Sequence, residues 1–102
     1  MTTTEISSGQ VVEVKDHPVP GHISQCLVLY PIDENGIEVI PYDGEKLIGR
    51  VGGGIPAQDI IKVSERLTED MYVILIVASG VGSETTARKV YQRPTISYTI
   101  RS

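Results

Sequence analysis

Apolar and polar residues alternate in two stretches of the chain, and this alternation predicts strands. Residues 22–32 place Leu27 and Leu29 on one face and Cys26 and Val28 on the other, while residues 95–101 alternate between apolar and polar positions. The turn sequence Asp33-Glu34-Asn35-Gly36 separates the first stretch from an apolar run over residues 37–42. Asn-Gly tolerates the positive φ of a tight turn, so the sequence predicts a β-hairpin here.

Three further segments have other patterns. Ile60, Ile61, Val63 and Leu67 recur at roughly helical spacing, which predicts a helix over residues 57–68. Residues 71–78 are apolar throughout, and we interpret them as a central strand covered on both faces. A glycine-containing loop over residues 79–83 then precedes a second predicted helix over about 84–91.

These elements predict an α+β fold. We expect one domain over residues 9–102, with a mixed sheet of about 4–6 strands and two helices at about 57–68 and 84–91. Residues 1–8 are rich in Thr and Ser, so we expect a disordered tail there.

Composition and charge bear on possible partners. The chain has 102 residues and a net charge of −4, without Phe or Trp. Residues 1–51 hold eight acids and three bases, giving −5, whereas residues 52–102 hold five acids and six bases, giving +1. The acidic total argues against nucleic-acid binding. A chain this short leaves much of its surface exposed, and the opposite charges of its halves favour a homo-oligomer.

Several features indicate a cytoplasmic protein. The one cysteine, Cys26, excludes an internal disulfide and a Cys-rich zinc site, and a reducing compartment is then the default. The N-terminal residues have neither a basic region nor an apolar run, so we expect no secretory signal. The apolar run over residues 71–78 is too short to span a bilayer. No cofactor motif is recognisable, and we expect neither a cofactor nor a metal.

The loop at 79–83 is the first candidate binding site. Its residues Ser79, Gly80, Gly82 and Ser83 precede the free N–H groups of the predicted helix 84–91. Such a helix start can hold an anion, and Arg88 lies one turn further along, where its side chain can lean back toward the loop. Glu84 competes with an incoming anion, and the simpler interpretation is that Ser83 caps the helix.

A second glycine loop contains Arg50 and Gly53. An arginine beside the glycines of residues 52–54 can clamp a carboxylate or phosphate while the backbone approaches it closely. The alternative interpretation is a connector with a surface arginine. The sequence does not show whether this loop meets residues 79–83.

Some short segments resemble a known family. The chain resembles the small pentameric vertex proteins of bacterial microcompartment shells in Gly9-Gln10-Val11-Val12, in Cys26-Leu-Val-Leu-Tyr-Pro-Ile-Asp33 with Asn35-Gly36, and in Ala87-Arg88 with Pro94. That family is built on a β-barrel, in which the helix predicted over residues 57–68 has no counterpart. The residues that match are generic strand and turn residues, so we do not assign the chain to the family.

The leading hypothesis from the sequence is therefore a non-catalytic, homo-oligomeric module that binds a small anionic ligand or a protein partner. An alternative is an enzyme or enzyme subunit with a site between protomers, built around the glycine loops 50–54 and 79–83. A third is a regulatory protein that docks through its acidic hairpin.

Overall fold

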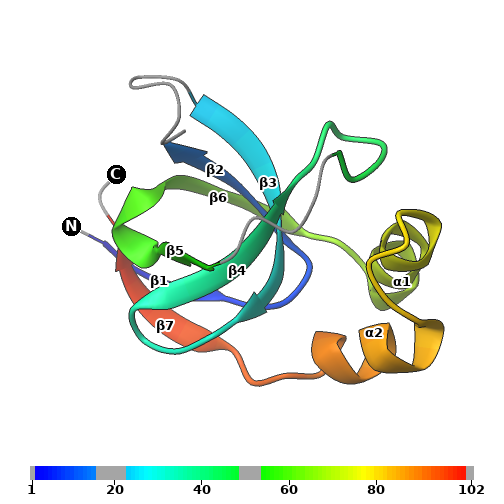
Figure 1. Cartoon of the computed structure of the whole chain (residues 1–102). Coiled ribbons are helices and arrows are strands. Elements are labelled where there is room, and N and C mark those ends of the chain that lie inside the picture. Colours follow the sequence, from blue (N-terminus) through cyan, green and yellow to red (C-terminus); the bar gives the residue numbers. More distant parts are fainter. Residues whose placement is uncertain (1, 16–22, 49–53, 101–102) are drawn as a thin grey trace.

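The computed structural model describes residues 2–15, 23–48 and 54–100, which form seven strands, two α-helices and one 3-10 turn (Figure 1). Arg50 and Gly53, and the loop they define, lie outside the described residues. In chain order the elements are β1 (Thr2–Ile6), β2 (Gln10–Lys15), β3 (Ile23–Pro31), β4 (Gly36–Pro41), β5 (Gly54–Pro56), η1 (Ala57–Asp59), β6 (Ile60–Arg66), α1 (Glu69–Ala78), α2 (Glu84–Tyr91) and β7 (Ile96–Ile100). The predicted α+β class is confirmed.

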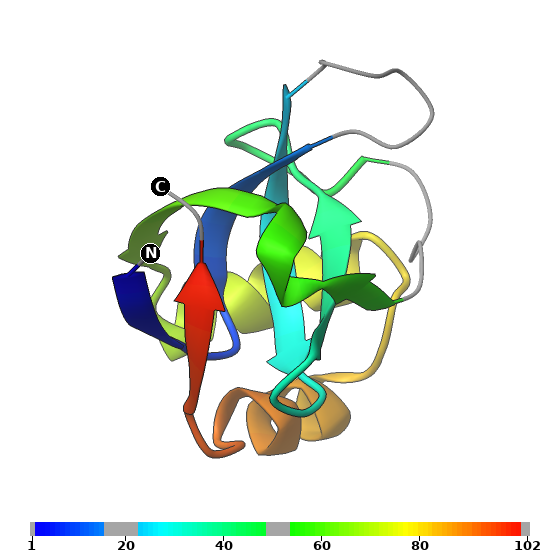
Figure 2. The same cartoon turned by 90° about the vertical axis from the view of Figure 1, so that its left-hand side faces the viewer.

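The larger sheet has five strands in the order β5-β4-β3-β2-β6, and every pair in it is antiparallel. Its two edge strands, β5 and β6, are consecutive in the chain and are joined by the three residues of η1. So short a connection between opposite edges requires the sheet to curl strongly, as Figure 2 shows. β1 and β7 form a separate antiparallel pair.

Both faces of the sheet are buried. On β3, Leu27 and Leu29 pack into one apolar cluster with residues of α1 and α2. Cys26 and Val28 point to the other face, where they pack with Ile6 of β1 and Tyr98 of β7. The alternation predicted for this strand is thus confirmed, and β3 is covered on both faces.

Residues 2–8 are part of the fold, whereas the sequence predicted a disordered tail over residues 1–8. β1 pairs with β7 from Thr2↔Ile100 to Ile6↔Ile96, and the side chain of Ile6 is completely buried. The hydroxyl of Ser8 donates to the carbonyl of Val90 at 3.0 Å. The local composition is polar because one face of β1 remains exposed. The strand that orders β1 is β7, which comes from the far end of the chain.

The prediction of a helix over residues 57–68 is wrong. These residues form η1 and then β6, which pairs with β2 through Val12↔Val63 and Val14↔Ile60. The register between β2 and β6 shifts twice, so the apolar residues of β6 do not alternate strictly and their spacing resembles that of a helix. The β-branched residues Ile60, Ile61 and Val63 are nevertheless typical of a strand.

The strand predicted over residues 71–78 is also wrong, because this segment belongs to α1. Thr68 caps the helix by accepting a hydrogen bond from the Met71 N–H, and Glu69 and Asp70 occupy the first turn. At the other end Gly80 adopts a positive φ of 76°, and the N–H groups of Gly80 and Val81 bond to the carbonyls of Val77 and Ile76. This is a Schellman motif, which ends the helix.

The predictions for residues 84–91 and for the hairpin are confirmed in position. α2 spans exactly Glu84–Tyr91, and the chain turns between β3 and β4 at residues 32–35. The expected positive φ is wrong, since neither Asn35 nor Gly36 has one. Instead the Asp33 carboxylate accepts hydrogen bonds from the N–H groups of Asn35 and Gly36 at 2.8 and 2.9 Å. The turn is held by this Asx geometry.

Candidate functional site

The loop over residues 79–83 joins α1 to α2, so it follows a helix and not the end of a strand. The Ser79 hydroxyl donates to the carbonyl of Ile76 at 3.1 Å. Ser83 is the N-cap of α2: its Oγ accepts from the Thr86 N–H at 3.2 Å and shares a hydrogen bond with the Thr86 hydroxyl at 3.0 Å. Both hydroxyls are therefore engaged in ending one helix and starting the next.

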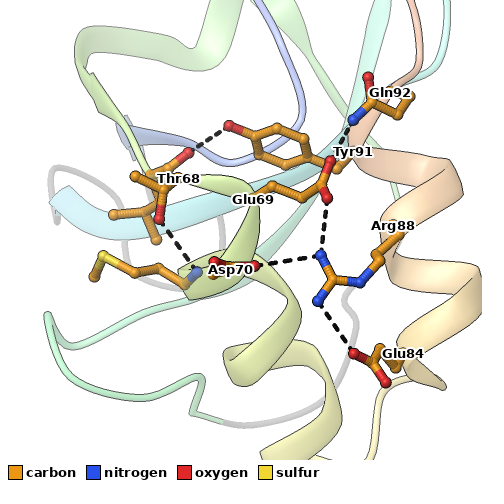
Figure 3. A network of polar contacts seen from close by, with 9 residues as sticks. Thr68, Glu69, Asp70, Glu84, Arg88, Tyr91 and Gln92 are labelled. Carbon is orange, nitrogen blue, oxygen red and sulfur yellow. Dashed lines mark hydrogen bonds and ion pairs between the residues drawn. The ribbon is translucent and has the colours of Figure 1, made fainter.

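Arg88 lies among carboxylates (Figure 3). One guanidinium nitrogen is 2.8 Å from Glu69 Oε2 and 3.3 Å from Asp70 Oδ1, and the other is 3.1 Å from Glu84 Oε1. These hydrogen bonds raise the pKa of Arg88 above its ordinary value. Three carboxylates around one guanidinium leave a local charge of −2, which repels an anion. The arrangement ties α2 to the start of α1.

Gly80 and Gly82 each lie in a part of the helical hairpin that explains the glycine by structure. Gly80 supplies the positive φ of the helix end. Gly82 lies with Val81 in the wall of an apolar pocket of about 150 Å³, which Tyr72, Ile76 and other residues of α1, α2 and β3 complete. A β-carbon at Gly82 would lie 3.4 Å from Ile76 Cγ2. The structure thus brings Gly82, Ser83 and Arg88 onto the same helical hairpin, but it surrounds them with apolar and acidic groups.

The sequence reasoning missed the outer face of α1. The exposed fractions of Met71, Ile74 and Val77 are 49%, 64% and 47%. These three residues are spaced three apart on a helix, so they form one stripe, while Tyr72, Val73, Leu75 and Ile76 point into the core. Beside the stripe a groove of about 350 Å³ is lined by Val73, Ile74, Val77, Ala78 and Glu84.

A signal for this helix is present in the sequence. Thr68-Glu69-Asp70 is a capping residue followed by two acids, and Ser79-Gly80 ends the apolar run, which together are typical of helix boundaries. Residues 71–83 contain no charged residue, so a helix over 69–78 cannot have the polar face usual for a surface helix. A strand over residues 71–78 would be covered on both faces, so the strand prediction gave no indication of the exposed stripe.

The described residues give no evidence for a metal site or a membrane span. Within residues 2–15, 23–48 and 54–100, no three His, Cys, Asp or Glu side chains are grouped so that they can hold a metal ion. Over the same residues, no helix has the length and apolar character needed to cross a membrane.

Comparison of the chain with models of protein families, with curated proteins and with solved structures finds no match. The family resemblance noted in the sequence thus has no support from a family model.

Proposed function

We propose that the protein is a non-catalytic binding module that forms a homodimer by packing the apolar stripe of α1 against the same stripe of a second copy. The observation that carries this proposal is the exposure of Met71, Ile74 and Val77 on one face of a helix without a polar side. A helix that is apolar all round is normally buried all round, and contiguous exposed apolar surface marks a contact site.

The stripe is complementary to itself. Met71 lies three residues before Ile74 and Val77 three residues after it. In an antiparallel pair of α1 helices related by a two-fold axis at Ile74, the long Met71 side chain of one copy meets the smaller Val77 of the other. The groove beside the stripe, lined by Val77 and Ala78, offers room for an apolar side chain from the partner. Such an interface uses the same patch on both copies, as a two-fold dimer requires.

The surrounding charges favour a protein partner over a lipid surface. Around α1 the charged side chains of the helical hairpin include Glu69, Asp70 and Glu84, and the guanidinium of Arg88 is paired with all three. Helices that lie on membranes carry Lys and Arg beside their apolar face, because lipid headgroups are often anionic.

The same charges bear on the anionic-ligand and enzyme alternatives. Both alternatives use Arg88 as a free cation next to the 79–83 loop. Its guanidinium is bonded to three carboxylates, so neither alternative gains support from the described residues.

The test is the mass of the protein in solution. We expect about 22 kDa, twice the chain mass of 11.1 kDa, by sedimentation equilibrium. Ile74→Lys should give the mass of the single chain with an unchanged circular dichroism spectrum. Ile32→Lys is the matched control, since Ile32 is 45% exposed in the β3–β4 turn, away from the stripe, and this variant should remain dimeric. A monomeric parent protein, or a dimeric Ile74→Lys variant, would contradict the proposal.

A further inference from the structure

The β3–β4 turn, η1 and β7 lie on the side of the molecule away from α1 (Figures 1 and 2). A polar groove is lined by residues of these three segments. Its volume is about 590 Å³. Glu34 and Asn35 contribute from the turn, Gln58 from η1, and Ser97 and Thr99 from β7. Self-association through α1 leaves this groove open, so the groove is independent of the proposed dimer.

The backbone around the groove is fixed by hydrogen bonds. The Ala57 N–H donates to the carbonyl of Asn35 at 3.1 Å, which joins η1 to the turn. The Tyr98 hydroxyl donates to the carbonyl of Gly36 at 3.1 Å, which joins β7 to the same turn. The three walls of the groove are therefore held together before any ligand arrives, and this reduces the entropic cost of binding.

The polar side chains of the groove are available to a ligand. Glu34, Asn35, Gln58, Ser97 and Thr99 are all exposed, and within the described part of the chain their side chains form no hydrogen bond or ion pair. They provide amide and hydroxyl groups that both donate and accept, and one carboxylate. The Asp33 carboxylate, by contrast, is used inside the turn.

β7 also presents a strand edge. Among the described residues, β7 pairs with β1 and with no other strand. In an antiparallel pair, alternate residues direct their N–H and C=O groups away from the partner strand, so one edge of β7 carries backbone groups without a strand partner. An extended peptide can add to such an edge, and main-chain hydrogen bonds then supply affinity.

The groove's charge selects among ligands. Among the described residues, Glu34 is the one charged residue that lines the groove, and no Lys or Arg of this part of the chain lines it. Residues 2–15, 23–48 and 54–100 thus offer a phosphate or another anion no cation there, and they place no aromatic ring in the lining on which a sugar or base can stack. We infer that this groove binds an extended polypeptide segment that adds to β7 and places a Lys or Arg side chain at Glu34.

The experiment selects peptides from a phage-displayed library of random decapeptides on the immobilised protein. We expect the selected peptides to contain Lys or Arg. A fluorescent synthetic copy of the most enriched peptide should lose about tenfold or more in affinity toward Glu34→Lys, because attraction is replaced by repulsion. Glu45→Lys removes an exposed acid from another turn and should bind as the parent does. In ¹⁵N NMR spectra the peptide should shift the amide signals of β7 and of residues 34–35.

Absence of enrichment, equal affinity for Glu34→Lys, or signal changes confined to α1 would each overturn the inference. The Ile74→Lys variant separates the two proposals. If it is monomeric and still binds the peptide, both proposals stand, and if the parent is monomeric but binds the peptide, the dimer alone fails.

Discussion

Two buried tyrosines show how single hydroxyl groups join separate elements. The Tyr72 hydroxyl on α1 donates to the carbonyl of Leu29 on β3 at 2.7 Å, and the Tyr98 hydroxyl on β7 reaches the turn at Gly36. Both side chains are about 1% exposed. Burial raises the pKa of each to about 12, because the phenolate loses its hydration there.

This pKa shift predicts a loss of stability at alkaline pH. The folded state holds the two phenolic protons up to about pH 12, whereas the ordinary pKa of tyrosine is 10.0. The contribution of these two tyrosines to the free energy of unfolding should therefore be constant below pH 10 and fall between pH 10 and 12. Urea titrations across this range measure the fall. Tyr72→Phe should reduce the slope and, by losing the bond to Leu29, cost about 1 kcal/mol at pH 7. A slope unchanged in Tyr72→Phe would contradict the assignment.

The backbone conformation requires a glycine at position 9 but not at position 36. Gly9 has a φ of 90°, and a β-carbon there would lie 3.0 Å from Tyr91 Cε2. Gly9→Ala should cost about 1–2 kcal/mol from the backbone conformation alone, and more from the contact. Gly36→Ala is the control: its β-carbon would have neighbours no closer than 3.7 Å, and its φ is not positive, so the change should be near neutral. Denaturant midpoints of the two variants test this contrast.

At the scale of elements, the helical hairpin depends on its ends. α1 begins at the Thr68 cap and ends in the Schellman motif, and after a four-residue connection from Ser79 to Gly82 the Ser83 cap starts α2. Arg88 then joins α2 to the first turn of α1. The loop that the sequence marked as a binding site thus has a complete structural role in which each of its polar side chains is bonded.

The cap gives a prediction for α2. Ser83→Ala should cost about 1 kcal/mol, because the Thr86 N–H loses its acceptor. Thr85→Ala changes the exposed second residue of α2, two positions after the cap. Alanine favours the helix, so this control should keep or slightly raise stability. Thermal unfolding followed by circular dichroism distinguishes the two. Equal midpoints in both variants would show that the cap contributes nothing.

At the scale of the whole molecule, the two ends of the chain close one face of the core. β1 and β7 pair along their lengths, and Ile6 and Tyr98 from these strands pack with Val12 and Val28 of the curled sheet. The helices cover the opposite face. Truncating a buried apolar side chain of β1 therefore removes packing from the core.

Ile6→Ala tests this closure. The side chain is fully buried, so the truncation should destabilise the protein by about 2–5 kcal/mol. Thr3→Ala, at an exposed position of the same strand, should change the free energy of unfolding by less than about 0.5 kcal/mol. If Ile6→Ala were as stable as Thr3→Ala in urea, residues 2–6 would not form part of the core.

The sequence by itself determined the elements whose evidence is local. The alternation over residues 22–32 and the Asp33–Gly36 turn predicted the β3–β4 hairpin, and Ser83 with the amphipathic residues after it predicted α2. Both depend on contacts within a few residues, and these contacts leave a periodic pattern or a cap in the sequence. Of the candidate site, the sequence identified Ser83 and Arg88 as neighbours of one loop, because they share one short helix.

The tertiary structure decided everything that depends on distant partners. Residues 71–78 are apolar at every position, so no periodicity distinguishes strand from helix, and it is packing of one side on β3 that leaves Ile74 exposed. β6 is a strand because it pairs with β2, and β1 is ordered because β7 lies beside it. The carboxylates that engage Arg88 come partly from α1, nearly twenty residues earlier. Each of these outcomes depends on burial and pairing between segments far apart in the chain, which a local pattern does not record.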